Sequence, residues 1–373
     1  MVDLFSQYSK IKPEVDSAIQ KTIEKSSFIN GEEVKLFQKE FAEYLNVPNV
    51  ITCANGTDAL QVAMMALGLQ PGDEVITSNF TFIATVEVIG LLRLKPVLVD
   101  VNYETFNLDP EQVRKSITPK TKAIVPVHVF GQAARMDELM KISREYGIPV
   151  IEDNAQAIGA KYTYPDGSSQ YAGTIGEIGT TSFFPSKNLG CFGDGGAIFT
   201  SNDKLAAKIR MIVNHGSQVK YYHDLIGVNS RLDTIQAAIL RIKLRQLDQY
   251  NEARREAANF YDRYLKENQD ILIPLRTDTG DHIFHQYTLK IQNGKRDKLK
   301  SYLAEKGIPS MVYYPVPLSL QKAFKHVAYN KGDFPVTEKL CTEVLSLPMH
   351  TELSPAQLKY IVDNVLEGIK NHG

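Results

Sequence analysis

The sequence predicts an α/β protein with a large domain on a mainly parallel, seven-stranded sheet and a smaller C-terminal α+β domain. Between residues 50 and 200, short apolar runs rich in β-branched residues alternate with helical patterns, which is typical of a parallel sheet covered by helices. Beyond residue 229 the pattern changes to a helical stretch followed by isolated strands. At about 150 residues per domain, 373 residues leave room for both units.

The elements of the large domain follow from these runs in chain order. A helical segment over residues 1–30 precedes the sheet. The expected strands are 50–53, 74–77, 96–101, 123–129, 148–152, 181–184 and 197–200. Helices over 56–67, 81–92 and 137–146 are expected between them, and Asp137 is expected to cap the last of these.

A change of pattern marks the junction of the two domains. Ile235, Ile239 and Ile242 form one apolar stripe at helical spacing, and Leu240, Leu244 and Leu247 form a second. They predict one long helix that is apolar on two faces and connects a large domain over 1–240 to a small domain over 241–373. In the small domain we expect strands at 286–291 and 312–314, a helix at 296–305 and a terminal helix from residue 355.

Composition excludes several classes of partner. The 42 Lys plus Arg balance 43 Asp plus Glu, and without a basic block neither nucleic acid nor an anionic membrane is an expected partner. The 3 cysteines contain no CxxC pair, so we expect neither a disulfide framework nor a metal site. No signal peptide or membrane-spanning run is recognised, and a cytoplasmic protein is expected.

Two motifs hold reactive side chains near expected strand ends. Asp153 follows a strongly apolar strand, and open parallel sheets bind ligands at the carboxyl ends of their strands; a loop acid or helix cap is the alternative. Lys187 follows another strand, where apolar neighbours disfavour the charged amine, although a surface lysine is the alternative. The glycines that follow it fit neither the dinucleotide nor the ATP motif.

Two further motifs suit a phosphate and a flat ring. Gly56 and Thr57 open a helix directly after a strand, which suits a phosphate, with simple capping as the alternative. Phe82 follows another strand and is able to stack on a heterocycle, with core packing as the alternative. A strand-end acid, an amine, a phosphate site and a stacking ring are together what pyridoxal 5′-phosphate (PLP) requires.

The same motifs carry a family resemblance over nearly the whole chain. The chain resembles the sugar aminotransferases of the DegT/DnrJ/EryC1/StrS family, within the aspartate aminotransferase-like PLP fold, fold type I. The motifs are Asn55-Gly-Thr-Asp-Ala-Leu60, Glu152-Asp-Asn-Ala-Gln156, Ser182-Phe-Phe-Pro-Ser-Lys187-Asn-Leu-Gly190, Gly193-Asp-Gly-Gly196, Gly227-Val-Asn-Ser-Arg-Leu-Asp-Thr-Ile-Gln-Ala-Ala238, Tyr313-Tyr-Pro-Val-Pro-Leu318 and Ser346-Leu-Pro-Met-His350.

This resemblance implies a role for each matching residue. Lys187 would form a Schiff base with the cofactor and move the proton during transfer, and Asp153 would pair with the pyridine nitrogen. The other implied cofactor contacts are Gln156 to the ring hydroxyl, Phe82 stacked on the ring, Gly56, Thr57 and Ser182 to the phosphate, and Asn229 reaching the phosphate from a neighbouring subunit. The implied assembly is therefore a homodimer with shared active sites.

The implied reaction transfers an amino group in two half-reactions. Glutamate would convert PLP to pyridoxamine phosphate (PMP) and leave as 2-oxoglutarate, and a nucleotide-linked keto sugar would then take the amine. The motifs are most similar to members that aminate C3 of UDP-2-acetamido-2-deoxy-3-oxo-glucuronate in the biosynthesis of surface polysaccharides such as O-antigen. Arg231, Tyr313 and Tyr314 would contact the substrate, with a salt bridge to Asp233 as the alternative for Arg231 and interdomain packing as that for the tyrosines.

Some positions leave the substrate open. Ser319 stands where many family members have histidine, so a sugar contact is expected to be missing. His128 and Gln132 lie near another strand end and fit a substrate role and a polar network equally well. Two alternative functions remain at this stage: a C4 aminotransferase acting on a 4-keto-6-deoxy sugar, and a non-enzymatic regulator or sensor.

Overall fold

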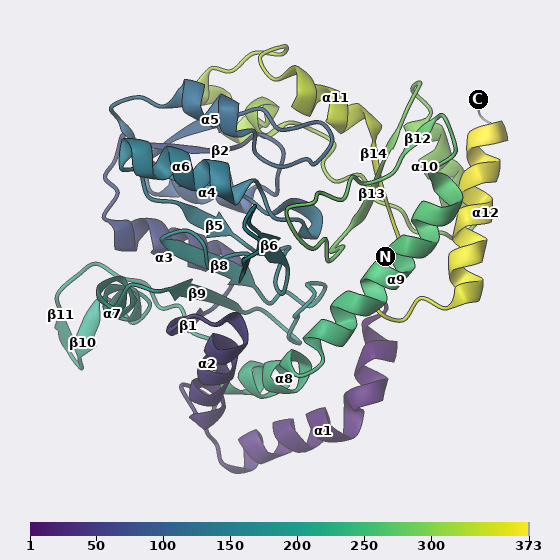
Figure 1. Cartoon of the computed structure of the whole chain (residues 1–373). Coiled ribbons are helices and arrows are strands. Elements are labelled where there is room, and N and C mark those ends of the chain that lie inside the picture. Colours follow the sequence, from purple (N-terminus) through teal and green to yellow (C-terminus); the bar gives the residue numbers. More distant parts are fainter. Residues whose placement is uncertain (372–373) are drawn as a thin grey trace.

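The computed structural model describes residues 1–371 and is built on a central sheet with helices packed around it (Figure 1). The strands are β1 (Asn49–Cys53), β2 (Glu74–Ser78), β3 (Lys95–Val99), β4 (Thr121–Val125), β5 (Ile151–Asp153), β8 (Ile178–Ser182) and β9 (Gly196–Thr200). Their pairing gives the order β1-β9-β8-β5 and β4-β2-β3. Parallel bridges from Ile124 to Val150 and from Val127 to Asp153 join the two parts into one sheet.

The direction of the strands confirms the predicted fold class. Strand β9 is antiparallel to both of its neighbours, and the other neighbouring strands run parallel. All seven expected strands form, with ends displaced by a few residues. The carboxyl ends of the parallel strands therefore meet along one edge, which is where such sheets bind ligands.

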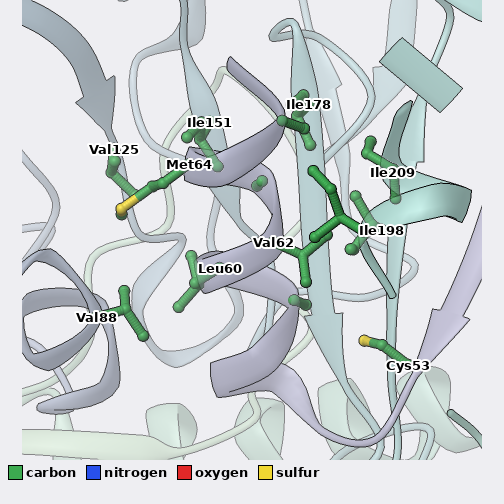
Figure 2. Packing of buried hydrophobic residues seen from close by; sticks show 14 of the residues in the cluster. Cys53, Leu60, Val62, Met64, Val88, Val125, Ile151, Ile178, Ile198 and Ile209 are labelled. Carbon is green, nitrogen blue, oxygen red and sulfur yellow. The ribbon is translucent and has the colours of Figure 1, made fainter. Parts of the chain in front are cut away.

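Helix α3 (Gly56–Leu67) covers the middle of this sheet (Figure 2). Its Met64 lies beside Val125 and Ile151, and its Val62 lies beside Ile198. All these side chains are buried. Burying an aliphatic side chain of this size contributes about 1.5–3 kcal/mol. This packing fixes the start of α3 beside the end of β8, which matters for the site below.

The remaining helices frame the sheet. They are α1 (Leu4–Glu24), α2 (Glu32–Leu45), α4 (Ala84–Leu91), α5 (Pro110–Ser116), α6 (Met136–Tyr146), α7 (Asp203–Ile212), α8 (Thr234–Leu244), α9 (Leu247–Leu265), α10 (Arg296–Glu305), α11 (Pro335–Glu343) and α12 (Pro355–Asn371), with 3₁₀ turns η1 (Val129–Gly131), η2 (Leu318–Leu320) and η3 (Lys322–Val327). Within residues 1–371, no helix has the length and apolarity needed to cross a membrane. The predicted cap at Asp137 is wrong, because α6 begins at Met136 and the Asp137 carboxylate accepts the Tyr162 hydroxyl.

The predicted long helix after residue 234 is two helices. It breaks at Arg245 and Gln246, which separate α8 from α9. The two predicted apolar stripes are real, because Ile239 and Ile242 pack on α1 while Leu240 and Leu244 pack in the cluster that contains α2. Helix α9 instead packs against α12 of the C-terminal part (Figure 1). The helices therefore change their packing partners close to residues 240–241, where we expect the domain boundary, and this boundary stays a proposal.

The C-terminal part has its own antiparallel sheet and core. Its strands are β12 (Ile271–Leu272), β13 (Tyr287–Ile291) and β14 (Val344–Leu347), in that order. The strand expected at 312–314 is absent, since only Met311 bridges to Ser346. Strand β14 was not expected, because it is a short apolar run directly after a helix. Two outlying hairpins complete the strands: β6 (Lys161–Thr163) with β7 (Ser169–Tyr171), and β10 (Ser217–Val219) with β11 (Tyr222–His223).

Candidate active site

A cavity of about 360 Å³ lies at the carboxyl ends of the parallel strands. Predicted site residues that line it are Gly56, Thr57, Phe82, Asp153, Gln156, Ser182, Lys187, Tyr313 and Tyr314. They come from the ends of β1, β2, β5 and β8 and from the loop before η2, so segments far apart in the sequence meet at one place. Asn229 and Arg231 do not line this cavity.

Lys187 lies in the loop that follows β8. Its backbone N–H donates to the Phe184 carbonyl at 2.8 Å, which closes a turn and directs the side chain towards the cavity. Burial lowers the pKa of the Lys187 ammonium to about 8, although the nearby Asp153 acts in the opposite direction. A lysine in water is almost fully protonated at neutral pH, so the cavity gives this amine a larger unprotonated fraction. The surface-lysine alternative is wrong.

Asp153 is the last residue of β5 and is buried beside the cavity. One carboxylate oxygen accepts the Thr85 hydroxyl at 2.8 Å and the other accepts the Ala155 N–H at 3.1 Å. These bonds fix the carboxylate at the end of the strand. The helix-cap alternative is wrong, because Asp153 is followed by a turn and not by a helix.

The adjacent Glu152 points away from the cavity and serves the fold. It is fully buried and accepts hydrogen bonds from the Gly173, Ile175 and Gly176 N–H groups. It also accepts from His128 Nε2 at 2.8 Å. Because His128 Nδ1 accepts the Ala134 N–H, the imidazole proton is on Nε2, and His128 belongs to a polar network.

The start of α3 offers unpaired backbone donors to the cavity. Asn55 caps the helix by accepting the Asp58 N–H at 2.8 Å, so capping does not explain Gly56 and Thr57. The N–H groups of Gly56 and Thr57 have no hydrogen-bond partner in the described part of the chain, as expected in a first helical turn. A Cβ on Gly56 would lie 2.7 Å from the Ser182 Cβ, so glycine is needed for the strand end to approach the helix start.

Aromatic and amide side chains form the other walls. Phe82 is 56% exposed and lines the cavity, whereas Phe80 is 1% exposed in the core. Phe80 packs in the core, whereas Phe82 faces the cavity. The core-packing alternative for Phe82 is therefore wrong. Gln156 accepts the Phe130 N–H at 2.8 Å and donates to the Tyr314 hydroxyl at 3.1 Å, which leaves one amide N–H for a ligand.

Asn229 and Arg231 lie on the segment after the β10–β11 hairpin. Asn229 is exposed and pairs through its backbone with Asn214. Between the two residues, the buried Ser230 donates to the Asp58 carboxylate at 2.6 Å and accepts the Ala54 N–H at 3.0 Å, which ties the segment to the start of α3. Arg231 forms no ion pair with Asp233 or with any other acid among residues 1–371, so the salt-bridge alternative is wrong.

Two polar residues near the site serve the fold. Ser319 is buried, lies outside the cavity and is hydrogen-bonded to Asn79. Gln132 accepts the Thr277 N–H at 3.0 Å and is also absent from the cavity wall. The polar-network alternative is therefore correct for Gln132 as well as for His128.

The sequence did not reveal His285, Thr81 and Asp194, which also line the cavity. His285 Nδ1 lies 3.2 Å from Asn188 Oδ1. Burial, followed by the nearby charges of Lys187 and Arg254, keeps the pKa of His285 well below its usual value of 6.5. A single histidine before a strand carries no signal of its own, and only the fold brings it to Lys187.

The residues present fit PLP on two observations. The Thr81 hydroxyl is buried at the cavity wall and has no hydrogen-bond partner in the described residues, so it is available to bind a polar ligand. The backbone donors at the start of α3 and the Asp153 carboxylate line the same cavity, and an anion and a protonated ring nitrogen match these two kinds of group. No residue among those lining the cavity conflicts with a flat, phosphorylated ring.

Known proteins resemble this chain along nearly its whole length. It is 47% identical over 369 residues to a pleiotropic regulatory protein of Geobacillus stearothermophilus, covering 98% of this chain and 97% of that protein. It is 45% identical over 360 residues to the UDP-2-acetamido-2-deoxy-3-oxo-D-glucuronate aminotransferase of Pseudomonas aeruginosa, covering 96% and 97%. It is 43% identical over 361 residues to a UDP-N-acetyl-3-dehydro-alpha-D-glucosamine 3-aminotransferase of Acidithiobacillus ferrooxidans, covering 97% and 95%.

Solved structures share the fold. DesV of S. venezuelae in complex with a ketimine intermediate superposes with a TM-score of 0.95 at 38% identity, covering 99% of this chain and 98% of that one. NtdA of Bacillus subtilis with bound cofactor PMP superposes with a TM-score of 0.90 at 31% identity, covering 97% and 82%. A model of the DegT/DnrJ/EryC1/StrS aminotransferase family matches residues 9–366. The chain therefore belongs to the DegT/DnrJ/EryC1/StrS aminotransferase family.

Proposed function

We propose that this PLP-dependent aminotransferase moves the amino group of glutamate to a nucleotide-linked keto sugar. The observation that carries the proposal is the meeting of the Lys187 amine and the Asp153 carboxylate in one cavity. We further propose that the acceptor is C3 of UDP-2-acetamido-2-deoxy-3-oxo-glucuronate and that the product serves the biosynthesis of a surface polysaccharide such as O-antigen.

Asp153 and Gln156 would orient the cofactor ring. Bound PLP supplies an electron sink for the electrons that are released at the substrate carbon. Asp153, held by Thr85, would accept a hydrogen bond from the ring nitrogen and keep that nitrogen protonated. The free N–H of Gln156 would donate to the ring hydroxyl, and Phe82 would provide a face for stacking.

The phosphate would lie at the start of α3. The N–H groups of Gly56 and Thr57 point along the helix dipole, which favours an anion at this end. The Ser182 hydroxyl adjoins them across the close contact with Gly56. These donors would hold the cofactor while Lys187 is free to react.

Lys187 would carry the cofactor and then move a proton. Its pKa of about 8 leaves an appreciable fraction of Nζ unprotonated near neutral pH, as a nucleophile requires. As a free amine, Nζ would take up the proton of the substrate carbon and later give it back during the transfer. A group with a pKa close to the working pH is suited to both steps.

A homodimer would complete the site. Large apolar side chains are exposed on and beside the β10–β11 hairpin, among them Tyr221 at 80% and Ile226 at 90%. Such a patch favours a protein partner. Because Asn229 follows this hairpin and lies outside the cavity of its own chain, we propose that it reaches the phosphate in the partner's site.

The segment after the β10–β11 hairpin would also bring the Arg231 guanidinium to the sugar nucleotide. Arg231 is partly exposed and lacks an ion pair among the described residues, so its guanidinium is available to a carboxylate or phosphate. Tyr313 and Tyr314 line the cavity and would contact the sugar. Two of the relatives above are named for a 3-oxo or 3-dehydro sugar, which supports C3 over the C4 alternative.

The decisive experiment uses the visible spectrum. The purified protein should be yellow with PLP, borohydride should attach the cofactor to Lys187, and glutamate should shift the band to that of PMP. Adding the 3-oxo-uronate and, separately, a 4-keto-6-deoxy sugar nucleotide then identifies the acceptor, because only the true acceptor restores the PLP band.

A protein that ignores PLP and glutamate would contradict the proposal and favour a regulatory role. That alternative draws only on the names of relatives. The assembled amine, acid and anion site stand against it.

A further inference from the structure

Asn188 directly follows Lys187 and is buried, at 4% exposure, without lining the cavity. Its side-chain amide forms hydrogen bonds through both of its ends. Nδ2 donates to Asn251 Oδ1 at 2.8 Å and to the Ile283 carbonyl at 3.3 Å. Because that carbonyl only accepts, the amide oxygen is the atom that faces His285 Nδ1 at 3.2 Å and accepts a hydrogen bond from it. The side chain next to Lys187 thus binds three partners from outside its own loop.

The partners of Asn188 are themselves held by the fold. Asn251 lies in α9, is 2% exposed and donates to the Ile158 carbonyl, in the turns after β5, at 3.3 Å. A Cβ on Gly159 would lie 2.6 Å from Asn251 Nδ2, so glycine is needed for this approach. On the other side, the Ile283 N–H donates to a carbonyl of the 3₁₀ turn η1 at 2.9 Å. Asn188 is therefore bound to positions that have little freedom to move.

The loop that carries Lys187 has no comparable anchor besides Asn188. Within residues 184–190, no other side chain forms a hydrogen bond to another part of the described chain. Leu189 packs in the core and holds the loop down, but an apolar contact is not directional. Lys187 Nζ forms neither a hydrogen bond nor an ion pair with the described residues. The place of the amine therefore depends on its backbone, which Asn188 ties to α9 and to the segment before β13.

We propose that Asn188 is a positioning residue, which holds the loop of Lys187 so that the amine keeps its place in the cavity while it is not linked to the cofactor. This inference rests on the proposed role of Lys187. A linked lysine has its position set by the covalent bond, whereas the free amine has only its loop. A displacement of a reacting group by about 1 Å costs up to about 10²-fold in rate. The three hydrogen bonds of Asn188 should therefore matter most in the steps that use the free amine.

The test compares two forms of the cofactor on full-length protein that has been stripped of cofactor. PLP bonds to the Lys187 amine, whereas PMP has an amine in place of the aldehyde and enters the same cavity without that bond. The initial rate of PLP band formation is recorded at about pH 9, above the Lys187 pKa of about 8, so that it reports the place of the amine and not its protonation. Borohydride followed by peptide mapping shows that Lys187 was modified, and calorimetry gives the dissociation constant of PMP.

Loss of the anchor should affect PLP and not PMP. Asn188→Ala should slow the bonding of PLP to Lys187 by about 10-fold or more and leave the dissociation constant of PMP within about 2-fold. Asn251→Ala removes the 2.8 Å bond from the other side and should slow the bonding by a smaller factor. Because both substitutions act on one contact, the double variant should be no slower than Asn188→Ala alone.

Asn49→Ala is the matched control. Asn49 is also buried and joins two elements, since its Nδ2 donates to the Asp203 carboxylate at 2.8 Å and its Oδ1 accepts from the Arg210 guanidinium at 3.3 Å. It begins β1, whereas the other end of that strand leads to the cavity. Its PLP rate and its PMP affinity should both equal those of the parent protein.

The outcomes distinguish this inference from the proposed function. An unchanged PLP rate in Asn188→Ala overturns the inference, and so does a PMP affinity that falls as much as the rate, because it shows general damage to the cavity. An equal loss of rate in Asn49→Ala also overturns it. Failure to trap PLP on Lys187 in the parent protein overturns the proposed function instead. Should Asn188→Ala not fold, Asn251→Ala decides by the same two measurements, since it breaks the same contact and leaves Asn188 in place.

Discussion

Asn79 and Ser319 bind each other through two hydrogen bonds that join the central sheet to the C-terminal part of the chain. The Ser319 N–H donates to Asn79 Oδ1 at 2.7 Å, and Asn79 Nδ2 donates to Ser319 Oγ at 3.0 Å. The Asn79 carbonyl also accepts the Leu318 N–H at 3.2 Å. Both side chains are buried, so this contact joins the end of β2 to the segment that carries Tyr313 and Tyr314 into the cavity.

Asn79→Ala should therefore loosen one wall of the cavity. It leaves the buried Ser319 N–H without a partner, which costs about 1–3 kcal/mol in the free energy of unfolding. Urea denaturation measures this loss, and steady-state kinetics should show a KM for the sugar nucleotide that rises more than kcat falls. Ser319→Ala keeps the backbone bond and should cost less; an equal cost would show that the side-chain bond dominates.

Thr85 should control the orientation of Asp153. Thr85→Val removes the hydroxyl that donates to Asp153 at 2.8 Å and nearly preserves the shape. We expect the single-turnover rate of conversion of PLP to PMP by glutamate to fall by about 10-fold, and Asp153→Asn to lower it by about 10² or more.

Thr77→Val provides the matched control for this pair. Thr77 is also buried and donates to the Val125 carbonyl at 2.7 Å, but it does not contact Asp153. Its half-reaction should keep the parent rate. A loss in Thr77→Val as large as in Thr85→Val would show that the effect comes from the sheet and not from the acid.

The buried Lys243 should lower the free energy of unfolding at neutral pH. It is 1% exposed in α8, and burial lowers its pKa to about 8. Below pH 8 the lysine is charged in both the folded and the unfolded states, so the full penalty of about 3 kcal/mol applies. Between pH 8 and the unfolded value of 10.5 the unfolded chain holds more protons, and stability rises with pH.

Replacing Lys243 tests whether its buried charge destabilises the folded protein. Lys243→Met should stabilise the protein by up to about 3 kcal/mol at pH 7, and the gain should fade towards pH 10.5. Denaturant unfolding at several pH values measures it, with the exposed Lys204→Met as the control for a lost charge. A gain that does not change with pH would mean that methionine acts by packing alone.

The fold was predictable where local sequence pattern and tertiary environment agree. The strands of the sheet are continuous apolar runs because both faces are covered, and α3 was predicted to the residue since it lies between a small-residue turn and Gly68. The break between α8 and α9 was missed because the apolar stripes continue through Arg245 and Gln246. Strand β14 was missed because its signal exists only once β13 lies beside it.

The site was predictable to the extent that parallel sheets gather ligands at strand ends. Asp153 and Ser182 end strands, and Gly56 begins a helix after one, so their meeting follows from the topology. His285 and Thr81 carry no comparable pattern, because only the fold brings the imidazole beside Lys187 and leaves the Thr81 hydroxyl unpaired among the described residues. The exposure of Phe82 against the burial of Phe80 is likewise a tertiary outcome.

A shared active site predicts that two inactive chains can rescue each other. Lys187→Ala lacks the amine, and Asn229→Ala would lack the contact that we propose crosses to the partner. A mixed dimer would then hold one site with both defects and one site with neither, so unfolding and refolding an equal mixture should restore about a quarter of the parent activity, since half of the dimers are mixed. Each variant refolded alone is the control. If the mixture is no more active than the two separate samples, Asn229 does not act across the interface, and its place directly before the anchored Ser230 must serve its own chain.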